Sequence, residues 1–149
     1  MGRFKFKLQT LRRLRQLHRD EQRGRLAQAY EAERILMQQQ ADVAAEQQSI
    51  VEAQRVLVQA PAVDVNQLLT ATRYRMALDA QARALAEQAE RVGEEVERRR
   101  QAVLQAEREV RVLDKLEERQ RRLHAAAAAA AEAKRLDEVA VNRWEAPRL

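Results

Sequence analysis

A regular stripe of apolar and small residues between residues 78 and 113 constrains the fold of this chain most strongly. Steps of four and three residues alternate along it, and only Arg99 places a charge in the stripe. A repeat of 3.5 residues is typical of a helix that coils around another helix. We therefore expect a long helix whose partner is the first half of the chain. The stripe comprises Leu78, Ala82, Leu85, Ala89, Val92, Val96, Val103, Ala106, Val110 and Leu113.

The first half of the chain predicts a helix from about Phe4 to about Gln59, with a poorer row of contact residues. Gln39 and Glu46 occupy positions where leucine is expected, and polar residues there lower stability while fixing the register of the helices. The apolar residues form two series, Leu8, Leu11, Leu14 and Leu17 at every third position and Leu36, Val43, Ile50 and Leu57 at every seventh.

The break between the helices is predicted at residues 60–66, because Pro61 disfavours helix at the preceding residue. Asp64 with Gln67 resembles a capping box, which starts the second helix near residue 65–67. That helix is expected to continue to about residue 142. The predicted fold is therefore all-α, a single coiled-coil hairpin over residues 1–149 with two antiparallel helices.

The position of the turn also predicts which residues face each other. Residue numbers of facing residues should add up to about 124, because the turn centres near residue 62. Arg25 then lies near Arg99, and the second helix extends beyond the first from about Arg121 as a single helix. The expected apolar pairs are Leu8 with Leu116, Leu11 with Leu113, Leu14 with Val110, Ala32 with Val92, and Leu36 with Ala89.

Composition agrees with long helices and excludes several classes of protein. Charged residues make up 34% of the chain and aromatic residues 3%, which leaves too little bulk for a globular core. The absence of cysteine excludes disulfides and thiolate metal sites. No apolar run reaches the roughly 20 residues of a membrane span. We expect neither a secretory signal nor myristoylation, since the start lacks an apolar core and Phe6 replaces the required Ser or Thr.

Charge is unevenly distributed along the sequence. Residues 1–25 carry net +7, residues 26–97 net −6, and residues 98–122 net +4. An antiparallel hairpin brings the two basic segments together, so we expect a basic end that holds the termini and a more acidic half near the turn.

The sequence contains no pattern for catalysis, and we expect no enzyme activity, cofactor or metal. His18 and His124 are the only histidines, and neither has the neighbours of a catalytic or metal-binding group. Nucleic-acid binding is not expected, because arginine is interleaved with glutamate and aromatic residues are scarce. Membrane contact stays open, since Phe4, Phe6, Leu8 and Leu11 alternate with cations in an amphipathic start; the alternative is the frayed end of a coiled coil.

Four short motifs together resemble the flagellar type III export protein FliJ family. They are Phe4-Lys5-Phe6-Lys7-Leu8-Gln9 at the start, Tyr74 with Leu78, Leu113-Asp114-Lys115-Leu116-Glu117-Glu118-Arg119, and Leu136-Asp137-Glu138 followed by Ala140. Their order and spacing cover nearly the whole chain. The run of alanines from Ala125 to Ala131 departs from the family pattern.

The resemblance implies a non-enzymatic part of the bacterial flagellar protein export apparatus. It implies the central stalk of a hexameric export ATPase ring, an escort for export chaperones, and a link to the membrane export gate. It implies a cytoplasmic location, peripherally at the cytoplasmic face of the plasma membrane. Tyr74 and Leu78 are then candidate gate contacts, although packing of Tyr74 near Ile50 is an alternative. Candidate ATPase contacts are Phe4, Phe6, Leu8, Arg12, Arg13, Arg15, Arg19, Leu136, Asp137 and Glu138.

Two other functions stay open on the sequence alone. One is the equivalent stalk of a virulence type III secretion system, and the other is a generic coiled-coil adaptor. A neighbouring gene for an export ATPase would favour the stalk.

Overall fold

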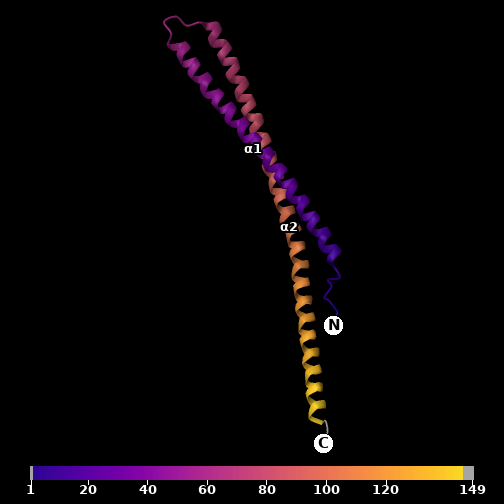
Figure 1. Cartoon of the computed structure of the whole chain (residues 1–149). Coiled ribbons are helices and arrows are strands. Elements are labelled where there is room, and N and C mark those ends of the chain that lie inside the picture. Colours follow the sequence, from indigo (N-terminus) through magenta and orange to yellow (C-terminus); the bar gives the residue numbers. More distant parts are fainter. Residues whose placement is uncertain (1, 146–149) are drawn as a thin grey trace. The chain divides into compact units, whose positions relative to one another are not determined.

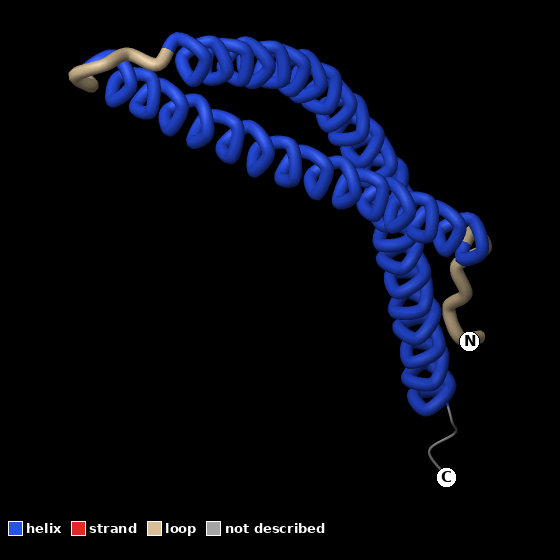
Figure 2. The backbone as a smooth tube through the Cα atoms, turned by 90° about the horizontal axis from the view of Figure 1, so that it is seen from above, coloured by secondary structure: helices blue, strands red, loops and turns tan. Residues whose placement is uncertain are grey.

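Two long helices make up almost all of the computed structural model, which describes residues 2–145 (Figure 1). α1 spans Gln9–Gln59 and α2 spans Val65–Glu145. The helices pack against each other in an antiparallel hairpin, which confirms the predicted all-α fold class. Figure 2 shows the only loops among the described residues, the N-terminal segment and the turn between the helices.

Asp64 determines where α2 begins. Its carboxylate oxygen Oδ1 accepts hydrogen bonds from the backbone N–H groups of Asn66 (3.0 Å) and Gln67 (3.3 Å). These groups have no partner within the helix, so a carboxylate at this position stabilises the first turn. The preceding turn contains Pro61, which lacks a backbone N–H and separates the two helices.

The hairpin consists of two compact units. The first, Glu21–Val103, contains the turn and is called the turn unit below. The second contains residues 2–20 and 104–145 of the described chain and is called the terminal unit.

In both units, α2 presents the predicted stripe to α1. Leu78 is 3% exposed, Val96 5% and Ala106 1%, so the stripe carries the core of the protein. Val43 of α1 packs with Leu78 and Leu85 in the turn unit, joined by the half-buried residues Leu36, Ile50 and Ala82. The 3.5-residue period of α2 therefore predicted its buried face correctly.

In the turn unit, α1 contributes a mixed apolar and polar row. Gln40, Gln47 and Gln54 are half-buried, whereas the expected polar positions Gln39 and Glu46 are exposed, so the prediction was wrong by one residue. Ala29, not Ala32, is buried. The half-buried and buried positions recur every three and four residues, at Gln22, Leu26, Ala29, Glu33, Leu36, Gln40, Val43, Gln47, Ile50, Gln54 and Leu57.

Polar contacts fix the register of the turn unit. Gln47 Nε2 donates to Asp79 Oδ1 (2.8 Å), and Gln54 Nε2 donates to Thr72 Oγ1 (3.2 Å). The residue numbers of each pair add up to 126, close to the expected value of about 124.

Arg25 and Arg99 are neighbours, as the register predicted. Arg99 Nη1 donates a 2.6 Å hydrogen bond to the backbone carbonyl oxygen of Arg25. Each guanidinium also has its own carboxylate, Glu95 for Arg99 (2.6 Å) and Glu21 for Arg25 (2.7 Å). Because each of the two arginines pairs with a different carboxylate, both cations can lie at the same level of the hairpin.

In the terminal unit, the face of α1 differs from the prediction. Arg12, Gln16 and Arg19 are half-buried. The leucines expected to face α2 are exposed instead, Leu8 by 37%, Leu11 by 38%, Leu14 by 57% and Leu17 by 61%. A three-residue spacing drifts around a helix of 3.6 residues per turn, so these leucines cannot all face one partner.

The N-terminal segment is not helical before Gln9, although helix was expected from about Phe4. No Ser, Thr, Asp or Asn stands immediately before Phe4 to cap a helix there. Phe6 is instead buried, at 9% exposure, and Phe4 lies against His124 of α2. The segment thus adds aromatic contacts that a helical start would have lost.

Beyond His124, α2 continues to Glu145 as an exposed helix. Of residues 125–144, only Ala128 is half-buried, and the others are exposed. Alanine has the highest helix propensity, so the run Ala125 to Ala131 favours helix without a packing partner.

Candidate partner-binding surfaces

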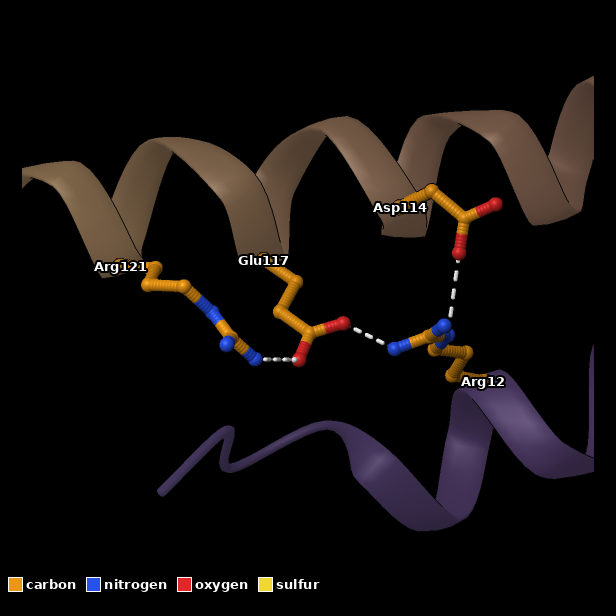
Figure 3. A network of polar contacts seen from close by, with 4 residues as sticks. All are labelled: Arg12, Asp114, Glu117 and Arg121. Atoms are coloured by element: carbon orange, nitrogen blue, oxygen red, sulfur yellow. Dashed lines mark hydrogen bonds and ion pairs between the residues drawn. The ribbon is translucent and has the colours of Figure 1, made fainter. Parts of the chain in front are cut away.

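A cluster of ion pairs holds α1 to α2 in the terminal unit (Figure 3). Arg12 reaches Glu117, and its Nε lies 3.0 Å from Asp114 Oδ1. Arg121 Nη2 donates to the other oxygen of Glu117 at 2.9 Å. The Glu117 side chain is 15% exposed and lies between these two arginines. The FliJ-like stretch around Asp114 and Glu117 thus makes ion pairs within the chain.

The other predicted arginines of the terminal unit have different environments. Arg15 Nη1 pairs with Glu109 at 3.0 Å across the helices, and Arg19 pairs with the adjacent Asp20 at 3.0 Å. Arg13 is exposed and forms no ion pair with the described residues. Of the four arginines predicted to contact an ATPase, Arg13 is therefore the one whose charge is not paired within residues 2–145.

The aromatic residues of the opening motif also make contacts within the terminal unit. The Phe4 and His124 rings lie 5.6 Å apart between centroids and are tilted by 59°. The Arg121 guanidinium lies 5.4 Å from the centre of the Phe4 ring, in range for a cation–π interaction. Phe6 is buried, so a partner would reach its ring only after the N-terminal segment moves.

The exposed C-terminal part of α2 carries the Leu136-Asp137-Glu138 motif. Leu136 is 58% exposed, and Asp137 and Glu138 are also exposed. Trp144 is 82% exposed and is the only tryptophan in the chain. These side chains are free to contact a partner, as is Arg143, which lies in the last turn.

In the turn unit, Tyr74 joins the two helices through its hydroxyl. The hydroxyl donates a 2.5 Å hydrogen bond to Glu46 Oε2 of α1, and Tyr74 remains 48% exposed. This hydrogen bond raises the pKa of Tyr74, because ionisation would place a phenolate against a carboxylate. Leu78, one helical turn further, is buried in the core beneath Tyr74 and is not part of the exposed surface.

A groove lies beside Tyr74 and was not predicted from the sequence. Its volume is about 440 Å³, and its walls combine aliphatic, aromatic and amide side chains. Nearby, Leu69 is 49% and Val65 62% exposed. The groove forms only when α1 and α2 pack together, so no local sequence pattern reveals it. It is lined by Ile50, Asn66, Gln67, Thr70, Ala71 and Tyr74.

Charge differs between the two units, as the sequence blocks indicated. The terminal unit with its flanking residues contains seventeen Lys or Arg and ten acids, a net charge of +7. The turn unit contains eleven Lys or Arg and thirteen acids, a net charge of −2. The terminal unit is therefore the part of the chain that attracts acidic partners.

Within residues 2–145, no cluster of three or more potential metal ligands is present. In the same residues, neither helix has a segment both apolar and long enough to span a bilayer.

Comparison with known proteins identifies the family. No curated protein and no solved structure matches the chain. The model of the family described as "Flagellar FliJ protein" matches residues 4–148, nearly the full length. The hairpin fold agrees with this match. The opening motif and the Leu113–Arg119 motif agree with it too, since their side chains make contacts within the chain. The chain therefore belongs to the flagellar FliJ family, a family of flagellar protein export components.

Proposed function

We propose that this chain is the central stalk of a hexameric flagellar export ATPase ring and does not itself catalyse a reaction. It also escorts export chaperones and links the ATPase to the membrane export gate at the cytoplasmic face of the plasma membrane. The observation that supports the stalk role best is the exposed continuation of α2 beyond His124. A single helix is about 10–12 Å wide, which suits insertion into the central channel of a ring.

The charge of the terminal unit also supports a contact between this unit and the ATPase. A net charge of +7 attracts acidic channel loops over long range, which raises the association rate at low salt. Arg12 and Arg15 already pair with acids of α2. Arg13 and the exposed residues Leu136 to Glu138 are therefore the better candidates for direct contact.

ATPase stimulation tests the stalk role. The purified export ATPase is assayed with the full chain and with a chain that ends at Ala131. Truncation should abolish most of the stimulation, while the circular dichroism of the remaining helices stays that of a hairpin. Full stimulation by the truncated chain would contradict insertion of α2. A Leu136→Asp variant separates side-chain contact from helix length.

Tyr74 is the proposed contact for the export gate, through the groove beside it. Tyr74→Ala should weaken capture of the cytoplasmic domain of the gate protein about tenfold, as expected for an interface aromatic. Tyr30→Ala is the matched control, since Tyr30 is 41% exposed and also hydrogen-bonded, to Arg100 at 2.9 Å. Equal weakening by both variants would assign the effect to the hairpin and not to a contact.

A further inference from the structure

The exposed leucines of α1 in the terminal unit form an apolar band that the proposed stalk role does not use. Leu11, Leu14 and Leu17 are 38%, 57% and 61% exposed. Residues three apart are separated by about 60° around a helix, so the three leucines cover about 120°. Arg12, Gln16 and Arg19 face the other way and are half-buried.

Cations dominate the segment that carries this leucine band, and the two acids that follow it, Asp20 and Glu21, are each paired with an arginine. Residues 2–19 contain seven Lys or Arg and no Asp or Glu. Asp20, the first acid in the sequence, is paired with Arg19 at 3.0 Å. The acids of α2 in this region, among them Asp114 and Glu109, are paired with Arg12 and Arg15. The surface around the band therefore offers positive charge to an anionic partner.

Some of these cations are available for such a partner. Lys5, Lys7 and Arg13 are exposed and form no ion pair with the described residues. Arg13 borders the leucine band, being about 100° from Leu14 around the helix. Lysine and arginine side chains beside an apolar helix face are the pattern of helices that lie in the interface of anionic membranes.

The length of the band distinguishes a lipid surface from a partner helix. A helix partner needs an apolar stripe sustained over at least three heptads. The leucine series ends at Leu17, since the next positions on that face are Asp20 and Glu21. From Leu11 to Leu17 the helix rises only about 9 Å. A deformable bilayer surface accepts such a short convex ridge.

We propose that the N-terminal part of α1 binds anionic lipid headgroups, with Leu11, Leu14 and Leu17 inserted at the interface. This inference rests on the proposed location at the membrane. It differs from the amphipathic start considered from the sequence, because Phe4 lies against His124 of α2, Phe6 is buried and Arg12 is paired. The leucines proposed to face the lipid therefore lie further along the chain than Phe4 and Phe6.

Vesicle co-sedimentation without the ATPase tests the proposal, so that it can fail independently of the stalk role. The full chain should bind vesicles containing phosphatidylglycerol at least about tenfold more tightly than pure phosphatidylcholine vesicles at low salt. Changing Leu14 and Leu17 to Gln should weaken binding at least about fivefold. The control changes Val112 and Leu123 to Gln, because these apolar residues of α2 are 64% and 61% exposed, and should keep the wild-type affinity.

The cations are tested in a second variant with Lys5, Lys7 and Arg13 changed to Gln. This variant should bind about tenfold or more weakly, and added salt should reduce its remaining difference from wild type. Circular dichroism checks folding, and Ala replaces Gln at Leu14 and Leu17 if helicity falls. Equal binding to neutral vesicles, or unchanged binding after loss of either the leucines or the cations, would overturn the proposal.

A fluorescent probe reports insertion directly. Tryptophan at Leu14, in a Trp144→Phe background, should shift its emission to shorter wavelength on anionic vesicles, whereas tryptophan at Leu123 should not. Absence of a shift at Leu14 would contradict insertion. Concentration-dependent self-association that disappears with the Leu14 and Leu17 changes, without vesicle binding, would assign the band to a second copy and overturn the lipid proposal.

Discussion

The hydroxyl of Tyr74 on α2 donates a 2.5 Å hydrogen bond to the carboxylate of Glu46 on α1. This contact links the helices of the turn unit at a surface where both residues remain exposed. It predicts a measurable dependence on pH, because ionisation of the phenol would bring two negative charges together.

The pKa of Tyr74 should lie above its ordinary value of 10.0. A folded-state pKa raised above the unfolded value stabilises the hairpin below pH 10, and this contribution is lost as pH rises through the folded pKa. Ultraviolet titration in a Tyr30→Phe background measures it. Glu46→Gln should move the titration towards lower pH, and an unchanged titration would show that the hydrogen bond does not persist in solution.

Val96→Asp should strongly destabilise the hairpin, because Val96 is 5% exposed in the turn unit. Burying an unpaired carboxylate costs about 3 kcal/mol or more. Val112→Asp is the matched control on the same helix, since Val112 is 64% exposed and its change should cost within about 0.5 kcal/mol. Thermal unfolding followed by circular dichroism compares the two. Similar losses in both would refute the buried face.

Arg12→Glu should destabilise the terminal unit by about 1–3 kcal/mol, because three carboxylates would then meet at Asp114 and Glu117. Arg13→Glu makes the same change in charge one residue away, where the side chain is exposed. It should leave the melting temperature nearly unchanged. High salt should reduce the effect at Arg12, and equal effects at both arginines would contradict the observed ion pairs.

Gly93→Ala should stabilise the turn unit by about 0.5–1 kcal/mol, since alanine restricts the unfolded chain and favours helix. A methyl group at Gly93 would meet no atom within 4 Å. Gly24 in α1 offers equally open space and should respond alike. Urea unfolding measures both variants. A loss of stability in either variant would contradict the open space beside these glycines.

The buried face of α2 was predictable because its residues are apolar and follow one period without interruption. Val96, Val103 and Val110 are all buried as expected. The face of α1 was harder to predict, because half-buried glutamines such as Gln40 and Gln47 carry no hydrophobic signal. In the terminal unit, ion pairs at Arg12 and Arg15 determine which side of α1 meets α2, and leucine spacing misled the prediction.

The candidate surfaces were predictable to a smaller extent. The family motifs selected candidate residues but did not indicate whether these residues make contacts within the chain or with partners. Phe6 and Leu78 are buried, whereas Leu136 and Tyr74 are accessible. The groove beside Tyr74 and the leucine band both depend on how the helices are rotated against each other, which a single sequence does not specify.

The alanine run between His124 and Glu132 has a geometric consequence for the C-terminal part of α2. The seven alanines, of which only Ala128 is half-buried, act as a spacer of nearly two helical turns. Inserting one alanine there would rotate Leu136 and its neighbours by about 100° and advance them by about 1.5 Å. The contacts at Phe4 and Arg12 would stay unchanged. The length of this run therefore sets the angular phase at which the Leu136-Asp137-Glu138 motif is presented to whatever surrounds it.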